Sequence, residues 1–266
     1  MTRLGKNCIW CEEPTNDSDV SHVLPECFGN RDAQVLPKGT VCRSCNNYFG
    51  SKIEPALVED PVIHAICVAL RVVDPGDAHV FRDRLFDQNH TPVASPERRV
   101  GLHLTVHASS FDLDVAYEVK GTIRKEYDRR SVARFSQAIH KLAFESFVWL
   151  QMQPDPKPAR LDLFATSFRP IRRWVRYGEP TRKVRPLVRM PATSVTHEWE
   201  PRLWGFEQHL AIELRLFGDW LAVSLTSPHG EAQEHLTRWC SASAKPGWLI
   251  SERFSPLGAH DGGNTA

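Results

Sequence analysis

CIWC at residues 8–11 and CRSC at residues 42–45 are the two segments that decide the fold of the N-terminal part of the chain. In each segment two residues separate the cysteines, so both thiolates of a pair can reach one ion from a tight turn. Two such pairs supply four tetrahedral ligands and predict a structural zinc ion, which holds the fold and takes no part in chemistry. Two disulfides or four unligated thiols are the alternatives. The predicted zinc ligands are Cys8, Cys11, Cys42 and Cys45.

The segment that contains these cysteines is too short to bury a large apolar core, and a bound metal would offset its ordering entropy. We therefore predict a small N-terminal domain over residues 1–58 and a larger domain over residues 59–254. Residues 255–266 are polar and rich in glycine, which predicts a disordered tail. The remaining cysteines are expected to be buried apolar residues: Cys27, Cys67 and Cys240.

The composition places the chain among globular proteins, since 41% of its 266 residues are hydrophobic and 24% are charged. Its longest apolar runs are shorter than a membrane span, and residues 1–10 contain no apolar signal core. We therefore expect a cytoplasmic protein that neither crosses a membrane nor is secreted. In that compartment closely spaced cysteines favour metal binding over disulfides.

Alternating apolar residues after residue 58 predict two β-hairpins. The first covers residues 100–119, with its turn at residues 107–110 and its second strand beginning at Phe111. The second joins residues 210–216 to residues 220–225 through a turn at Gly218 and Asp219.

Helical periodicity is strongest in residues 131–150, where a broad apolar stripe predicts a long helix that Ser131 caps. Short strands are predicted at residues 161–164 and 171–175, whereas residues 62–72 fit either a helix or a strand. The predicted fold class is therefore α+β, with antiparallel hairpins and a long central helix in the larger domain.

A net charge of only +1 hides a basic middle segment, residues 121–189, in which Lys and Arg clearly outnumber Asp and Glu. Guanidinium groups can bond phosphate oxygens in pairs, and the aromatic rings of Trp174 and Tyr177 could stack on bases. The alternative is a solvated face whose arginines pair with carboxylates of the acidic flanking segments. The predicted nucleic-acid-binding residues are Arg169, Arg172, Arg173, Arg176, Arg182, Lys183 and Arg185.

A second pattern surrounds the cysteine pairs. SHVLPE lies between them at residues 21–26, and NNYFGSKIE follows the second pair at residues 46–54. This order, with His-Val-Leu-Pro between two C-x-x-C pairs and an Asn after the second, resembles the zinc-stapled HNH endonucleases. The resemblance covers about residues 8–57, and the larger domain contains no motif that we recognise.

The resemblance implies a ββα-metal, treble-clef-like site in which two strands and a helix surround one divalent cation, Mg²⁺ or Mn²⁺. His22 is at the position of the general base that activates water against a DNA phosphodiester. Asn46 is at the position of a catalytic residue that helps to hold the cation, and Asn47 lies beside it. The implied chemistry is sound, since a neutral imidazole can accept a proton from water and a hard cation stabilises charge on phosphate.

The sequence departs from the family pattern at two positions. The residue before the base is usually an acidic cation ligand, but here it is Ser21. Glu54, about two helical turns beyond Asn46, is our first candidate for the missing carboxylate, and Glu26 is the second. The nearest counterparts of the middle Asn of the pattern are Asn30 and Gln34.

The combined prediction is a cation-dependent DNA endonuclease, of restriction or defence type by analogy, whose larger domain aids DNA binding or specificity. A homodimer would suit a double-strand cutter. Two alternatives stay open. One is a non-catalytic, zinc-stapled nucleic-acid-binding protein that uses residues 169–189, which the serine at position 21 favours. The other is a nuclease that is silent until a ligand or partner binds the larger domain.

Overall fold

The computed structural model describes most of the chain. The described residues are 6–28, 34–60, 63, 102–108, 117–123, 129–153, 161–178, 187–190, 199–206, 209–216, 219–228, 231–242 and 249–250. Several predicted features lie outside them, in whole or in part: residues 62–72 apart from Ile63, Asn30, Arg182, Lys183, Arg185, Gly218, the side chains of Cys27, Cys67 and Cys240, and residues 255–266. Within the described part, no helix is both long enough and apolar enough to cross a membrane.

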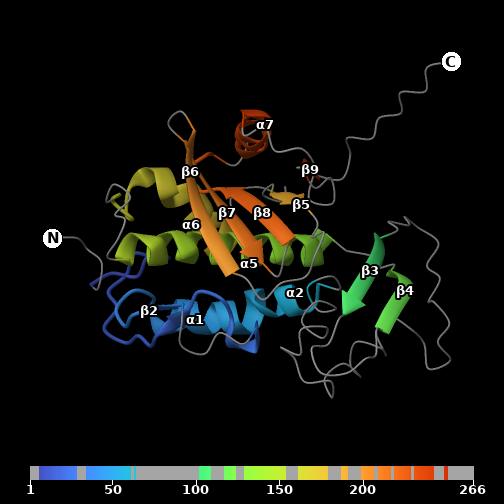
Figure 1. Ribbon diagram of the computed structural model, residues 1–266. Coiled ribbons are helices and arrows are strands. Elements are labelled where there is room, and N and C mark those ends of the chain that lie inside the picture. The colour runs from blue at the N-terminus through green and yellow to red at the C-terminus, as the bar shows by residue number, and fades with distance from the viewer. Residues whose placement is uncertain are drawn as a thin grey trace.

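The N-terminal elements follow the predicted ββα order (Figure 1). Two short strands, β1 and β2, pair antiparallel, with Ser21 opposite Leu36 and His22 opposite Val35. Helix α1 follows β2 and continues into the π-helical segment η2 and then α2. Their bounds are β1 Ser21–His22, β2 Val35–Leu36, α1 Arg43–Tyr48, η2 Phe49–Ile53 and α2 Pro55–Val58, with a 3-10 turn η1 at Glu26–Phe28.

Helix α5, Arg129–Met152, lies at the centre of the molecule. Figure 1 shows it between the N-terminal elements below and a β-sheet above, and it contacts β2, η2 and α2 on one side and β6, β7 and β8 on the other. The predicted helix over residues 131–150 is therefore confirmed. The helix begins at Arg129, two residues before Ser131. Ser131 therefore lies inside the first turn, and the prediction that it caps the helix is wrong.

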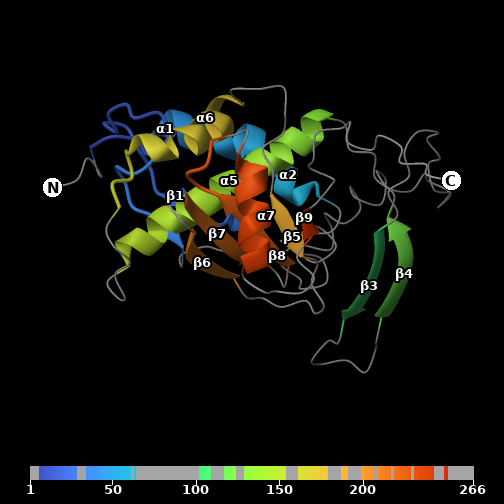
Figure 2. The same cartoon turned by 90° about the horizontal axis from the view of Figure 1, so that it is seen from above.

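The sheet beyond α5 is antiparallel, with the strand order β6-β7-β8-β5-β9. Its central pair confirms the second predicted hairpin, with Leu214 opposite Leu221. Helix α7, Ala232–Ala242, contacts β8 and lies on the side of the sheet away from α5 (Figure 2). The strands are β5 Val188–Met190, β6 Trp199–Phe206, β7 His209–Leu216, β8 Asp219–Ser224 and β9 Leu249–Ile250.

The first predicted hairpin exists, but its second strand is displaced along the sequence. Strand β3, Leu102–Ala108, pairs antiparallel with β4, Tyr117–Ile123, so the second strand begins at Tyr117 instead of Phe111. Alternation continues beyond Val119 to Ile123, and a period of two does not determine which part of such a run pairs.

The strands predicted at residues 161–164 and 171–175 are wrong. The first region is a turn that leads into a 3-10 helix, η3, Thr166–Phe168, and the second lies inside α6, Arg169–Tyr177. Pro170 does not prevent this helix, because a proline in the first turn lacks only a donor that has no helical partner there. Gly178, with φ of 70°, ends the helix in a left-handed conformation.

Aromatic rings join the N-terminal elements to α5 and α6. The ring of Trp10 lies 5.0 Å from those of Phe49 and Phe144, in edge-to-face geometry. On α5, Phe144 lies 5.6 Å from Phe168, which lies 5.2 Å from Phe147. All five residues are at most 2% exposed, so a single apolar core spans these elements.

Replacing Phe144 by alanine should therefore destabilise the whole protein. The cavity left by the ring should lower the free energy of unfolding by about 3–5 kcal/mol, measured by urea denaturation of zinc-loaded protein. Tyr177→Ala is the control, since its ring is 56% exposed and its removal should cost no more than about 0.5–1 kcal/mol. Equal destabilisation in the two variants would contradict a core centred on α5.

Candidate functional site

The four predicted zinc ligands come together. Their sulfur atoms all lie within 4.8 Å of one another, and the Sγ atoms of Cys11 and Cys42 are 3.7 Å apart. The four cysteines are free thiols, which contradicts the disulfide alternative. A tetrahedron of thiolates at about 2.3 Å from zinc has sulfur–sulfur separations of about 3.8 Å. The cluster is therefore compatible with a structural zinc ion.

Backbone and side-chain donors surround the sulfur atoms. The backbone N–H groups of Trp10 and Cys42 donate to Cys8 Sγ, each at 3.4 Å, and the N–H of Cys45 donates to Cys42 Sγ at 3.4 Å. Arg176 of α6 interacts with Cys45, and its guanidinium lies 4.4 Å from the centre of the Tyr48 ring. These donors stabilise negative charge on the thiolates that zinc requires.

The predicted nucleic-acid-binding arginines of α6 divide into two groups. Arg172 is 3% exposed, donates to the backbone oxygen of Leu163 and pairs with Glu12 at 2.7 Å. With Arg176, it attaches α6 to the cysteine cluster, and Figure 2 shows α6 beside α1. Arg169 and Arg173 of the same helix are exposed. The described part of the basic segment is therefore only partly available to a ligand.

The side chain of His22, the predicted general base, is 20% exposed. Its Nε2 lies 3.1 Å from Oε1 of Glu26, which is itself exposed. Successive side chains of a strand point to opposite sides, and Ser21, which precedes His22 on β1, points toward Asn46. Glu26, the second candidate for the missing carboxylate, therefore contacts the imidazole and not Ser21.

Ser21 forms the link between β1 and α1. Its hydroxyl is within hydrogen-bonding distance of two acceptors, Asn46 Oδ1 at 3.1 Å and Glu145 Oε2 at 3.3 Å. The amide nitrogen of Asn46 donates to the backbone oxygen of Val20 at 3.4 Å, which orients the amide oxygen toward the serine. Asn47 is exposed at the next position of α1.

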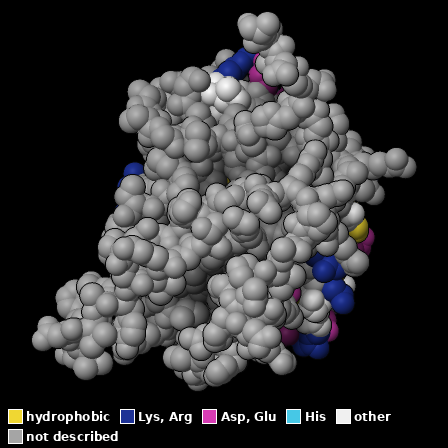
Figure 3. All heavy atoms as spheres, turned by 90° about the vertical axis from the view of Figure 1, so that its right-hand side faces the viewer, with side chains coloured by type: hydrophobic (Ala, Val, Ile, Leu, Met, Phe, Trp, Pro, Cys, Tyr) yellow, Lys and Arg dark blue, Asp and Glu magenta, His cyan; other side chains and the backbone are white. Residues whose placement is uncertain are grey.

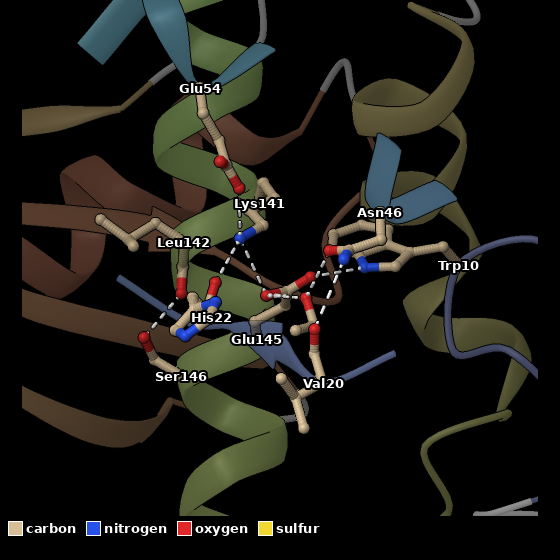
Figure 4. A network of polar contacts seen from close by, with 10 residues as sticks. Trp10, Val20, His22, Asn46, Glu54, Lys141, Leu142, Glu145 and Ser146 are labelled. Atoms are coloured by element: carbon tan, nitrogen blue, oxygen red, sulfur yellow. Dashed lines mark hydrogen bonds and ion pairs between the residues drawn. The ribbon is translucent and has the colours of Figure 1, made fainter. Parts of the chain in front are cut away.

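Lys141 of α5 is buried among three oxygen atoms (Figure 4). Its Nζ lies 2.8 Å from Glu54 Oε1, 2.9 Å from Glu145 Oε2 and 2.8 Å from the backbone oxygen of His22. An ammonium group has three donors, so this set satisfies it fully. Burial acts to lower the pKa of Lys141, but the carboxylates of Glu145 and Glu54 outweigh that effect and raise it. Lys141 is therefore charged.

Glu145, also on α5, completes the network. Its Oε1 accepts a hydrogen bond from the indole nitrogen of Trp10 at 2.9 Å, and its side chain is fully buried. Burial raises the pKa of Glu145, and its contacts with Lys141 and Trp10 offset that rise only in part. The geometry favours the carboxylate form, because the indole, the ammonium and the serine all present donors.

The sequence prediction did not include Lys141 or Glu145 among the site residues. The available signal was two opposite charges four residues apart in a stripe that should be buried, where charges need partners. Glu54, the first candidate for the missing carboxylate, pairs with Lys141 at the junction of η2 and α2. Gln34, a candidate for the middle Asn, contributes its backbone oxygen, which accepts from the N–H of Val23.

The residues around Ser21 fit a hard divalent cation. Serine, amide and carboxylate oxygens are the ligands that Mg²⁺ and Mn²⁺ prefer. Lys141 contributes one positive charge to two carboxylates, Glu54 and Glu145, so the group retains one negative charge. Asn46 is only half-buried, which leaves one side of the group open to solvent.

Removing the zinc should unfold the N-terminal elements. We expect one zinc ion per chain by elemental analysis and almost none in Cys42→Ser. The free energy of unfolding should fall by at least about 3 kcal/mol, because metal binding contributes directly to folding. Ser44→Ala, an exposed position in the same segment, is the control and should keep its zinc. Full stability of metal-free protein would contradict a structural role for the cluster.

Comparison with known proteins assigns only this N-terminal part. No curated protein and no solved structure gave a significant match. The family model described as HNH endonuclease matches residues 8–61, which include the cysteine cluster, His22 and Asn46 but neither Lys141 nor Glu145. The N-terminal part of the chain thus matches the HNH endonuclease family, as its sequence pattern predicts.

Proposed function

We propose that the protein is a cytoplasmic, cation-dependent DNA endonuclease. The observation that carries the proposal is the bond between Ser21 and Asn46, which joins the strand of His22 to α1 within the segment that matches HNH endonucleases. The imidazole of His22 is partly exposed and is therefore accessible to water and to a phosphodiester.

In the proposed mechanism His22 is the general base. Glu26 accepts a hydrogen bond from Nε2–H of the imidazole, which leaves Nδ1 with a lone pair for the proton of water. The water oxygen attacks phosphorus, its proton passes to Nδ1, and the bond from phosphorus to the leaving oxygen breaks. The carbonyl of His22 is held by Lys141, so the strand that carries the base has a fixed position.

Asn46 is proposed to hold the catalytic cation, Mg²⁺ or Mn²⁺, through Oδ1. When bound, such a cation stabilises the negative charge that develops on the phosphate and the leaving oxygen. Asn47 is proposed as an outer contact, because its side chain is exposed at the next position of the helix.

The exposed side of α6 is proposed to contact the DNA backbone. Arg169 and Arg173 are four residues apart and lie on one helix face, and Tyr177 extends that stripe by another four residues. On the face drawn in Figure 3, the described Lys and Arg side chains at the lower right and at the top lie beside Asp and Glu side chains. Arg172 and Arg176 are proposed to have a structural role.

A non-catalytic nucleic-acid-binding protein is the second candidate. Ser21 favours it, because a serine hydroxyl is a weak cation ligand where the family pattern has an acidic residue. This candidate predicts salt-sensitive DNA binding without strand cleavage.

His22→Ala should lower the rate of plasmid cleavage in Mg²⁺ or Mn²⁺ by about 10²–10⁴-fold, because the water then lacks its base. His235→Ala on α7 is the matched control and should cut at the wild-type rate. Zinc content and circular dichroism should be unchanged in both variants. If the wild type cuts no plasmid with any cation while His22→Ala binds DNA normally, the second candidate is correct.

The double variant Arg169→Ala/Arg173→Ala should bind DNA more weakly. The slope of log affinity against log salt should fall by about 1 for each phosphate that the variant no longer neutralises, whatever the DNA sequence. Arg238→Ala, an exposed arginine on α7, should leave affinity and slope unchanged. Fluorescence anisotropy with a labelled duplex measures both quantities, and equal behaviour of the two variants would remove α6 from the interface.

A further inference from the structure

The carboxylate of Glu145 lies beside Ser21, the position at which the N-terminal segment lacks an acidic residue. It comes from α5, 124 residues further along the chain, and its Oε2 is 3.3 Å from the serine hydroxyl. On the other side of the same hydroxyl lies Oδ1 of Asn46, at 3.1 Å. Oxygen atoms of α1 and α5 therefore both lie within hydrogen-bonding distance of the Ser21 hydroxyl on β1.

Hydrogen bonds do not fully explain why the amide oxygen of Asn46 and the carboxylate of Glu145 both lie next to the hydroxyl of Ser21. The serine hydroxyl has one proton, and both of its neighbours in the network, an amide oxygen and a carboxylate oxygen, are acceptors. Only one of them can receive that proton at a time. Oxygen atoms that converge in this way are the ordinary environment of a hard cation, which they surround at short distance.

The carboxylate of Glu145 is held in a fixed orientation. Trp10 donates to one of its oxygens at 2.9 Å, and Lys141 lies 2.9 Å from the other. Its side chain is fully buried, so it cannot turn toward solvent. Such outer contacts are what orient and tune the ligands of a metal site.

The charges of the network leave room for a cation. Lys141 is shared between Glu145 and Glu54, so two negative charges have one positive partner among these residues. Glu54 contacts the ammonium from the side of η2 and α2, whereas Glu145 also borders Ser21, whose hydroxyl bonds Asn46. The excess negative charge is thus available next to the half-buried amide of Asn46.

We propose that Glu145 is a ligand of the divalent cation and supplies from α5 the carboxylate that Ser21 does not. We assign Lys141 as a positioning residue that holds Glu145 and the carbonyl of His22 in register. The inference rests on the proposed function, which requires a cation at Asn46. It makes the site composite, because α5 lies outside the segment that matches the family.

Terbium luminescence tests whether Glu145 is a cation ligand, and the measurement does not depend on DNA cleavage. Tb³⁺ occupies oxygen-rich cation sites, and the indole of Trp10, which is bonded to Glu145, is close enough to sensitise its emission. Full-length, zinc-loaded protein should show saturable emission, and Glu145→Gln should weaken the apparent affinity by at least about tenfold. Glu231→Gln, an exposed glutamate before α7, is the matched control and should bind as the wild type does.

A second variant keeps the test decisive. In Ser21→Asp/Glu145→Gln the carboxylate moves from α5 back to β1, so the affinity for Tb³⁺ should recover to within about threefold of the wild type. Glu54→Gln should change it less than Glu145→Gln does. The assignment is overturned if folded Glu145→Gln binds Tb³⁺ as tightly as the wild type, or if the exchange variant folds and fails to recover.

Plasmid cleavage measured in parallel separates this inference from the proposed function. If Tb³⁺ binding depends on Glu145 but the wild type cuts no DNA, the ligand assignment stands and the nuclease proposal fails. If the wild type cuts DNA and Glu145→Gln both binds Tb³⁺ and cuts normally, the nuclease proposal stands and the assignment fails.

Discussion

The ammonium group of Lys141 is the interaction on which the arrangement of the site depends. It holds a carboxylate of the N-terminal elements, a carboxylate of its own helix and the backbone of the strand that carries His22. Removing three charges from water is costly, and the attraction among them offsets that cost only when the geometry is good. The gain lies in specificity, because the three groups fit together in one register of α5 against β1 and η2.

Helix α5 also explains why the N-terminal elements are not self-sufficient. The two-residue strands β1 and β2 and the short helix α1 bury little surface among themselves, and the ring of Trp10, which packs on Phe49, also packs on Phe144 of α5. The cysteine cluster lies at one end of this small unit, where a zinc ion would fix it, and α5 covers the other. The division of the chain at residue 58 stays a prediction, since apolar packing and charge pairs both cross it.

Local sequence patterns predict the parts of the site that depend on local spacing. The four zinc ligands follow from the short-range constraints of metal geometry, whereas the ββα order and the positions of His22 and Asn46 follow from the resemblance to the HNH endonucleases. The long helix and the hairpin of β7 and β8 follow from regular periodicity. The strand prediction at residues 171–175 is wrong because five apolar and basic residues fit a strand as well as they fit a helix that starts at a proline.

Contacts across long sequence separations are not predictable in this way. Nothing in the spacing of residues 8–54 indicates that a carboxylate more than a hundred positions away would reach Ser21, because only the packing of α5 brings it there. Likewise, four basic residues of α6 look alike in the sequence, yet two attach the helix to the cysteine cluster and two face solvent. Register on a packed helix determines which of them are available.

The shared polar network has a consequence for how this protein could be rearranged. Many small metal-stapled modules can be transplanted between hosts as self-contained cassettes. Here a graft of the first sixty residues would leave behind Lys141 and Glu145 of α5. The indole of Trp10 would then lose the carboxylate to which it donates a hydrogen bond. The N-terminal elements and helix α5 should therefore be inherited, recombined or engineered as one unit. The C-terminal boundary of that unit lies beyond α5.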